Sequence, residues 1–424
     1  MSKQQTAAQG KKPVATTGAG GGRKLDSVEA GAGKAGGGTD AIARARSVVE
    51  LLRAATPRID AERALPADVL AALHEARLFR LLLPRSVGGD EVHIKTLAQV
   101  MEIIAGANAS TGWCIGQAAG CAMAAAYLKP DVARRMFGPD DAVLAWGAGI
   151  QGKAVAVDGG YRVSGKWTFA SGCANATMLG AHCYVFEKDG TSKRMRADGR
   201  QVDRTALIVK AKAHVHDNWH TLGLRGTASN TYECDNLFVP DEETIDREDP
   251  AERMEHGTLY TITYTHAYAA AFSALMLGIA QATVGDLTDL ALVKTQRGAA
   301  SSMKDSPVFQ SQFAVLEARL RSLRAYLHTT LDAAWSNAEA TGEFPISERA
   351  NIKLASTYVI NQGVEIATEA YRAAGSSAIF PTNPFEQRLR DAMSASQQTQ
   401  GRPINYITLG RVLLGMPPDT ILLR

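Results

Sequence analysis

The hydrophobic period changes twice along this chain, and this change limits the fold more than any other feature of the sequence. From 40 to about 139, apolar residues recur at helical spacing. Between 142 and 240 the period becomes two, which is typical of half-buried strands, and after Pro240 the helical period returns. Helices, strands and helices in separate blocks predict an α+β fold with segregated elements, not an alternating parallel sheet.

Local signals place individual elements within these blocks. The dipeptide Asp158-Gly159 lies between two alternating segments and tolerates the positive φ of a tight turn, which predicts a β-hairpin. Ser306 is a good N-cap before Pro307, a first-turn proline, and Gly375 ends a later helix. The further elements that we expect are strands at 178–186, 205–210 and 231–239 and helices at 93–107, 110–128, 307–340 and 347–372.

These signals divide the chain into four segments. Residues 1–39 are rich in Gly, Ala, Lys and Thr and lack an apolar stretch, which predicts a disordered tail without a secretory signal. We expect an N-terminal helical domain over 40–140, a central β domain over 141–245 and a C-terminal helical bundle over 246–424.

Charge and cysteine content exclude several classes of function. The 46 basic and 43 acidic side chains give a net charge of +3, which lacks the basic footprint of nucleic-acid binding. The five cysteines form no C-x-x-C pair, which argues against a disulfide framework or a zinc site and favours a reducing cytoplasm. The histidines at 214, 216 and 220 have only Asp217 as a nearby carboxylate, so we expect no metal site.

The most apolar stretch of the chain is a candidate membrane span only by composition. It runs from Ala267 to Ala280 and is closed by Gln281, which is shorter than the roughly 20 apolar residues that cross a bilayer. We therefore expect a buried core helix and no membrane partner.

Five motifs occur in a set order along the chain. They are Ala109-Ser-Thr-Gly-Trp113, Val157-Asp-Gly-Gly-Tyr-Arg-Val-Ser-Gly-Lys-Trp167, Phe169-Ala-Ser-Gly172, Trp219-His-Thr-Leu-Gly-Leu-Arg-Gly-Thr227 and Ala370-Tyr-Arg-Ala-Ala-Gly-Ser-Ser377. Over about 41–414, this order resembles the acyl-CoA dehydrogenase superfamily, and more narrowly its flavin-dependent monooxygenases, which include oxygenase components of two-component phenol hydroxylases. The resemblance implies an N-terminal helical domain, a central β-barrel domain and a C-terminal four-helix bundle, with the flavin ring between the last two.

The resemblance also implies which residues meet the flavin ring. The strand that carries Trp167, Ala170 and Ser171 would pass alongside the ring, with the Ser171 hydroxyl or amide near the flavin N5, where a flavin hydroperoxide is held. An alternative is that Ser171 and Gly172 only make a bend, and that Trp167 is a core residue. Trp146 precedes a glycine-rich turn whose backbone could approach a flavin edge.

Other residues would hold the phosphate side of the cofactor. Arg225 and Arg297 are candidates because a guanidinium binds phosphate through a fork of donors. The turn that opens at Gly375 meets the cofactor of a neighbouring subunit in the dehydrogenase relatives. Each arginine could instead be a solvated charge, and Gly375 could be only a helix C-cap.

The chain departs from its family at the positions that carry proton transfer. Acyl-CoA dehydrogenases need a carboxylate base, and the matching positions here are Thr399 and Tyr268, so the dehydrogenase reading ranks second. The monooxygenases often carry histidines where this chain has Gln398 and Cys121. Glutamine cannot take a proton at neutral pH, which places phenol activation in doubt and favours an indole-like ring, an amine or a thioether.

The resemblance therefore implies an oxygenase component that uses reduced flavin, as FADH2 or FMNH2, and O2 to hydroxylate a small aromatic or heteroaromatic molecule. Ser171, Gln398 and Cys121 would act in catalysis, and Trp113, Gln117 and Gln398 would line the substrate pocket. A separate NAD(P)H-flavin reductase would supply the flavin, and a homotetramer is expected. The alternatives are a dehydrogenase or flavin oxidase with a relocated base, and a catalytically silent interaction scaffold.

Overall fold

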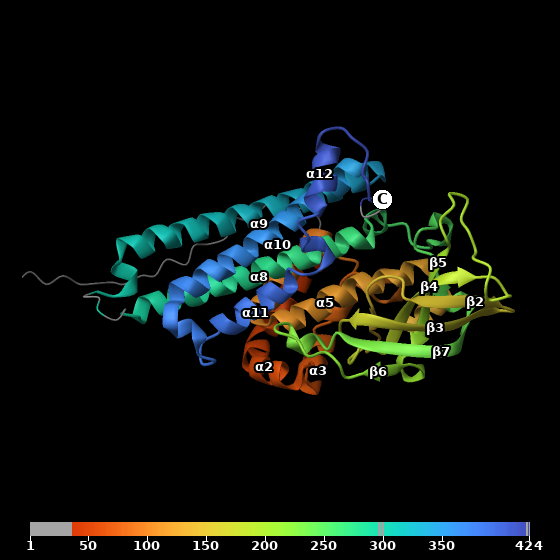
Figure 1. The fold of residues 1–424 in the computed structure, drawn as a ribbon, viewed down its shortest axis with the longest axis horizontal. Helices are drawn as coiled ribbons and strands as arrows, with labels where there is room; N and C mark the ends of the chain where they lie inside the picture. Colours follow the sequence, from red (N-terminus) through yellow and green to blue (C-terminus); the bar gives the residue numbers. More distant parts are fainter. Residues whose placement is uncertain (1–35, 296–297, 299–300, 421–422, 424) are drawn as a thin grey trace, which may run out of the picture. The chain divides into compact units, whose positions relative to one another are not determined.

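The first block of the chain is helical, as the sequence predicts. The structure, a computed structural model, describes residues 36–295, 298, 301–420 and 423. Its N-terminal helices are α1 (Gly36–Ser47), α2 (Val49–Glu62), α3 (Ala67–Glu75), α4 (Ile94–Ala107), α5 (Ala109–Ala122) and α6 (Pro130–Phe137) (Figure 1). Helix α1 begins before the expected end of the tail at Thr39, and residues 1–35 lie outside the described part of the chain.

The second block forms one mixed sheet. Its strands are β1 (Leu144–Trp146), β2 (Gly152–Val157), β3 (Gly160–Ala170), β4 (Met178–Phe186), β5 (Asp203–Val209), β6 (His214–His216), β7 (Asn230–Pro240) and β8 (Thr244–Ile245). The order is β6-β7-β3-β2-β4-β5-β8, with β1 pairing parallel to β4. The predicted hairpin joins β2 and β3, and Gly159 has a φ of 77° at its turn.

The predicted β-barrel is not confirmed, because within the described residues the sheet is open: the order of strands ends at β6 and at β8 without a pairing that joins them. Both edge strands are short, with three and two residues. Alternation along a strand determines which side chains face the core, but it carries no information on whether the two edges of a sheet meet.

The third block contains α7 (Thr258–Thr261), α8 (Tyr264–Val293), α9 (Pro307–Thr341), α10 (Ile346–Ala374), α11 (Phe385–Ala395) and α12 (Asn405–Leu413). Helix α8 has the length and hydropathy of a membrane span, but 83% of its most apolar window is buried inside the protein. Every residue of 267–280 is buried. The prediction of a buried core helix is therefore confirmed.

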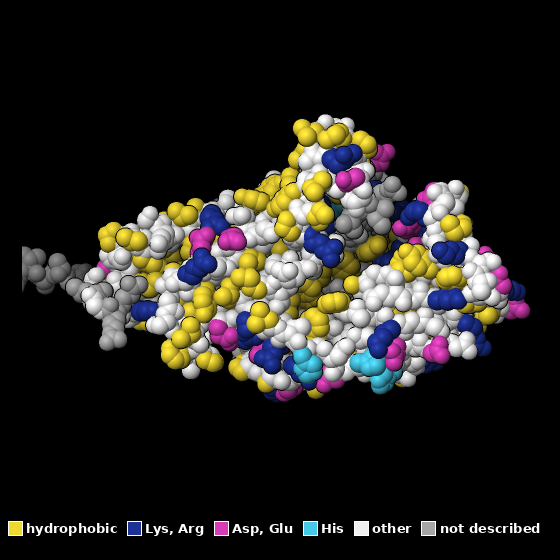
Figure 2. All heavy atoms as spheres, in the orientation of Figure 1, with side chains coloured by type: hydrophobic (Ala, Val, Ile, Leu, Met, Phe, Trp, Pro, Cys, Tyr) yellow, Lys and Arg dark blue, Asp and Glu magenta, His cyan; other side chains and the backbone are white. Residues whose placement is uncertain are grey.

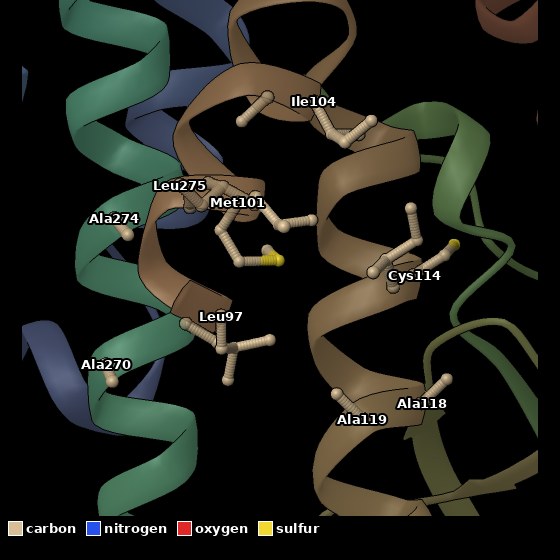
Figure 3. Packing of buried hydrophobic residues seen from close by; sticks show 14 of the residues in the cluster. Leu97, Met101, Ile104, Cys114, Ala118, Ala119, Ala270, Ala274 and Leu275 are labelled. Atoms are coloured by element: carbon tan, nitrogen blue, oxygen red, sulfur yellow. The ribbon is translucent and has the colours of Figure 1, made fainter. Parts of the chain in front are cut away.

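Helix α8 packs against α4, and α4 packs against α5, through small and flexible side chains. Met101 of α4 lies between the two neighbouring helices, and Ala270 and Ala274 of α8 keep the helices close together (Figure 3). The backbones of α4 and α8 come close at Gly278, where an added Cβ would lie 2.4 Å from the backbone oxygen of Glu102. Gly285, on the same helix, has no atom within 4 Å of such a Cβ.

These two glycines give a matched test of the helix crossing. We expect Gly278→Ala to lower the free energy of unfolding by about 1–3 kcal/mol, because the methyl group forces α4 and α8 apart. We expect Gly285→Ala to be neutral or to stabilise by up to about 1 kcal/mol, since alanine is the better helix former. Urea unfolding followed by circular dichroism measures both, and equal effects would contradict the packing account.

Candidate functional site

A large cavity lies where the sheet meets the C-terminal helices. Its volume is about 790 Å³, and hydrophobic side chains gather in a hollow in this region (Figure 2). Arg402 is the sole charged residue among those that line it. The lining residues are Trp113, Gln117, Trp146, Gly147, Ala148, Phe169, Ser171, Trp219, Thr221, Leu222, Gly223, Leu224, Thr227, Ser229, Tyr268, Phe272, Met393, Ser394, Gln397, Gln398, Thr399, Gln400 and Arg402.

Aromatic rings form one wall of this cavity. Phe272 of α8 stacks on Trp113 of α5 with ring centroids 4.2 Å apart, and on Tyr268 at 5.6 Å. Tyr268 and Phe272 are four residues apart, so they share one face of their helix. An added Cβ at Gly120 would lie 2.3 Å from the Tyr268 ring, so α5 needs glycine there. Such a wall suits a flat aromatic ligand.

A chain of hydroxyl groups begins at this wall and runs behind the cavity. The indole N–H of Trp113 donates to Oγ of Ser171 over 2.9 Å. Ser171 and Ser229 oxygens are 2.6 Å apart, and those of Ser229 and Thr227 are 2.7 Å apart. The Thr227 hydroxyl donates to the backbone oxygen of Leu224 over 2.9 Å.

The two ends of this chain set the direction of every hydroxyl in it. An indole nitrogen only donates and a backbone carbonyl only accepts, so each hydroxyl passes its proton toward Leu224. The Ser171 proton therefore points to Ser229, and the Ser171 backbone N–H donates to the oxygen of Phe169 over 3.0 Å. What Ser171 can still offer to the cavity is a lone pair of Oγ.

A second polar cluster lies beside the aromatic wall and is neutral. Gln117 donates to the Tyr268 oxygen over 3.2 Å, and the Cys121 sulfur lies 3.5 Å from the same oxygen. Burial raises the pKa of Cys121 to about 12, and burial also raises the pKa of Tyr268 well above its usual value. These groups can orient a ligand, but none of them is a base near neutral pH.

The segment after α11 presents a fixed amide to the cavity. The side-chain oxygen of Gln398 accepts from the backbone N–H of Gln400 over 2.7 Å. This bond orients the amide, and its buried Nε2 has no hydrogen-bond partner among the described residues. Gln398 therefore offers donors only.

A buried lysine supports the same segment. Lys353 is 2% exposed, and its ammonium donates to the side-chain oxygen of Gln400. Burial lowers the pKa of Lys353 to about 8, and no carboxylate of the described residues lies within ion-pair distance of it.

Helix α11 holds the loop that forms the opposite wall. The Asp391 carboxylate accepts from the backbone N–H of Leu224 over 2.6 Å, and the Ser394 hydroxyl accepts from that of Gly223 over 3.0 Å. An added Cβ at Gly223 would lie 2.1 Å from the backbone oxygen of Arg390. Asp391 is 4% exposed, and burial raises its pKa to about 7.

The structure brings together five of the residues that the sequence analysis places at the site: Trp113, Gln117, Trp146, Ser171 and Gln398 all line the cavity. Cys121 lies behind Tyr268 and does not line it.

The other expected residues that the structure describes lie away from the cavity lining. Trp167 is fully buried and donates to the backbone oxygen of His182 over 2.9 Å, and Ala170 is also fully buried. Arg225 pairs with Asp60 over 3.2 Å. Gly375 follows the end of α10 with a φ of 60°, and Arg297 is outside the described residues.

Several lining residues were not among the expected ones. Phe272 follows Tyr268 by one helical turn, which is a signal that the sequence contains. Trp219, Leu222 and Leu224 belong to the motif 219–227, in which the sequence analysis predicts a role for Arg225 alone. Arg402 had no local signal.

Comparison with known proteins gives a consistent set of relatives. The family described as "Acyl-CoA dehydrogenase, C-terminal domain" matches residues 270–400. An indole-3-acetate monooxygenase of Pseudomonas putida is 26% identical over 86% of this chain and 91% of its own. An FADH(2)-dependent resorcinol hydroxylase, oxygenase component, of Rhizobium sp. is 24% identical over 89% of this chain and 94% of its own.

Solved structures agree in fold. The 3-HSA hydroxylase from Rhodococcus sp. RHA1 superimposes with a TM-score of 0.82 at 22% identity, covering 91% of this chain and 99% of its own. XiaF from Streptomyces sp., in complex with FADH2 and glycerol, gives a TM-score of 0.82 at 21% identity, covering 90% and 97%.

The Asp391 contact can be tested through stability. We expect Asp391→Ala to cost about 1–3 kcal/mol, because the Leu224 N–H loses its acceptor. Asp391→Asn keeps an acceptor and removes the buried charge, so it should cost much less. The raised pKa of about 7 means that the folded wild type holds a proton that the unfolded chain loses near pH 4.

This difference in proton binding gives the sign of the pH effect. The free energy of unfolding of the wild type should fall relative to that of Asp391→Asn as the pH rises from 4 to about 7. Above that pH the difference between the two proteins should stay constant. Denaturant unfolding at several pH values measures it. A wild-type stability that rises relative to that of Asp391→Asn between pH 4 and 7 would contradict the assignment.

Proposed function

We propose that this chain, a member of the acyl-CoA dehydrogenase superfamily on its flavin-dependent monooxygenase branch, hydroxylates a small aromatic or heteroaromatic substrate in the cavity described above. The observation that carries the proposal is an aromatic-walled cavity without a carboxylate among its lining residues. Thr399 lines that cavity at the position of the family base, so the dehydrogenase reaction would lack its proton acceptor.

Reduced flavin, FADH2 or FMNH2, fits the residues present. The cavity volume is within the range of small-molecule and cofactor sites. We propose that Trp146, the backbone of Gly147 and Ala148, and Ser171 hold the ring. When bound, the reduced flavin supplies the two electrons with which O2 is split, so that one oxygen atom enters the product and the other leaves as water.

The hydroxyl chain supports a preference for the reduced form of the cofactor. Reduced flavin carries a proton on N5, whereas oxidised flavin has a lone pair there. If Ser171 lies near N5, as in the family, the free lone pair of its Oγ would accept a hydrogen bond from the N5–H of the reduced form. In the oxidised form the same lone pair would face the N5 lone pair, and the two would repel each other. The direction set by Trp113 and Leu224 would then favour binding of the cofactor before oxidation and its release afterwards.

Breaking the chain at its middle tests this preference without touching Ser171. In Ser229→Ala the Ser171 hydroxyl loses its acceptor and becomes free to donate into the cavity. We expect the ratio of Kd for oxidised to reduced FMN to fall about fivefold, equivalent to a net hydrogen bond of about 1 kcal/mol. Anaerobic fluorescence titration measures both constants.

The conservative variant Thr227→Ser keeps a hydroxyl in the chain and should keep the ratio. An unchanged ratio in Ser229→Ala, with a folded protein, would show that the direction of the chain does not select the redox state.

The neutral cluster beside the aromatic wall restricts the substrate. Gln117, Tyr268 and Gln398 can hold a ring and its polar groups, but none takes a proton near neutral pH. A phenol gains reactivity when it is deprotonated, whereas an indole-like ring is nucleophilic without a base. We therefore place indole-like substrates ahead of phenols.

Product analysis tests both the reaction and the substrate. With a flavin reductase, NADH, FMN or FAD, and air, we expect hydroxylated products from indole-type compounds and much slower turnover of matched phenols. Gln398→His adds a proton acceptor at the cavity and should raise phenol turnover specifically. Liquid chromatography with mass spectrometry measures the products, and turnover confined to phenols in the wild type would overturn the substrate assignment.

The partners follow from the same proposal. A separate NAD(P)H-flavin reductase supplies the reduced flavin. We also propose that α8, α9, α10 and α11 form the four-helix bundle of the family, that the chain works as a homotetramer in the cytoplasm, and that Arg297 and Gly375 contact cofactor at a subunit interface.

A further inference from the structure

Two side chains at one end of the cavity offer donors that no acceptor of the described residues satisfies. Arg402 lines the cavity, is exposed, and has no ion pair or side-chain hydrogen bond with any described residue. Gln398 lines it too, and its Nε2 is buried without a partner. Because the Gln398 oxygen is held by the backbone N–H of Gln400, the amide cannot flip to present an acceptor without losing that bond.

These two donors come from one short piece of chain. They flank the 3-10 turn Thr399–Gly401, which rises about 2 Å per residue, so their backbones are about 8 Å apart. The arginine side chain spans most of this distance, so both donors can reach one ligand at this end of the cavity. A guanidinium and an amide N–H can each donate to one oxygen of the same carboxylate.

The charges around this end lack compensation by the protein. The Lys353 ammonium, which donates to the side-chain oxygen of Gln400, also has no carboxylate within ion-pair distance among the described residues. No acidic side chain lines the cavity. A ligand with one negative group would balance this excess, since opposite charges attract and the charge of the buried Lys353 is screened little by water.

On the basis of the function proposed above, we propose that the substrate is an aromatic acid, whose carboxylate binds Arg402 and the Nε2 of Gln398 while its ring packs against Phe272 and Tyr268. The carboxylate then fixes which edge of the ring is presented to the reacting oxygen. Gln398 and Arg402 are specificity-determining residues in this arrangement, and neither exchanges a proton with the substrate.

Matched ligands that differ only in charge test the proposal by binding. Indole-3-acetate and indole-3-acetamide have nearly the same shape, and isothermal titration calorimetry gives a Kd for each without turnover. We expect the wild type to bind the acid at least tenfold more tightly than the amide. In Arg402→Gln the Kd of the acid should rise about tenfold, and the Kd of the amide should stay within about twofold.

Gln398→Glu is the sharper variant. Its carboxylate still accepts from the Gln400 N–H, so the turn is kept, but the two donors are replaced by a negative oxygen. The Kd of the acid should rise more than in Arg402→Gln, and the Kd of the amide should change little. Arg321→Gln, which removes an exposed arginine of α9 outside the cavity lining, is the charge-matched control and should leave both constants unchanged.

Three outcomes would overturn the proposal. Equal wild-type affinity for acid and amide would show that no charge is recognised. A parallel loss of both ligands in Arg402→Gln would indicate a structural role. A loss of reduced-FMN affinity with an intact preference for the acid would assign Arg402 to the flavin phosphate. Selective binding of the acid without any oxygenated product would support the carboxylate site and contradict the proposed oxygenase function.

Discussion

The backbone of Leu224 is the junction on which the cavity depends. Its N–H donates to the buried Asp391 carboxylate of α11, and its carbonyl accepts from Thr227 and from the indole of Trp219 over 3.0 Å. Leu224 has a φ of 52°, in the left-handed region that non-glycine residues rarely occupy. Such a conformation costs about 1–3 kcal/mol and persists only when its surroundings hold it.

Two more non-glycine residues with positive φ lie at the same cavity. They are Phe169, which lines it, and Ala228, which lies between two lining residues. Phe169 occupies the irregular end of β3, where the register to β7 shifts, and this irregularity turns the chain so that Ser171 reaches the Trp113 indole. The strain at Phe169, Leu224 and Ala228 is therefore concentrated where the hydroxyl chain and the cavity wall are built.

The sequence predicts the fold in blocks because the hydrophobic period records which side chains are buried. It predicts the β2–β3 hairpin from one dipeptide, and the buried part of α8 from its composition. It misses β1, β6 and β8, which have only two or three residues and so contain no full period. The open edges of the sheet were missed for a related reason, since edge closure depends on contacts between distant segments.

The site was predictable where a motif carries its chemistry in the side chain, as at Trp113, Ser171 and Gln398. It was less predictable where the backbone carries it. Trp167 and Ala170 belong to a correct motif, but their side chains point into the sheet core, and position in a motif does not determine direction. The charge of Arg225 is visible in the sequence, whereas the neighbouring Leu224 contributes through its backbone N–H and carbonyl, which leave no side-chain signal.

The polarity of hydrogen bonds then distinguishes the two ends of the cavity. At Ser171 every nearby proton is already donated inward, so the protein offers an acceptor. At Gln398 and Arg402 the oxygen is used and only donors remain. Two ligands that satisfy both ends must place an N–H at the Ser171 end and an anion at the end with Gln398 and Arg402. Reduced flavin and an aromatic acid have these groups, so the cofactor and the substrate proposals depend on opposite halves of one hydrogen-bonding pattern.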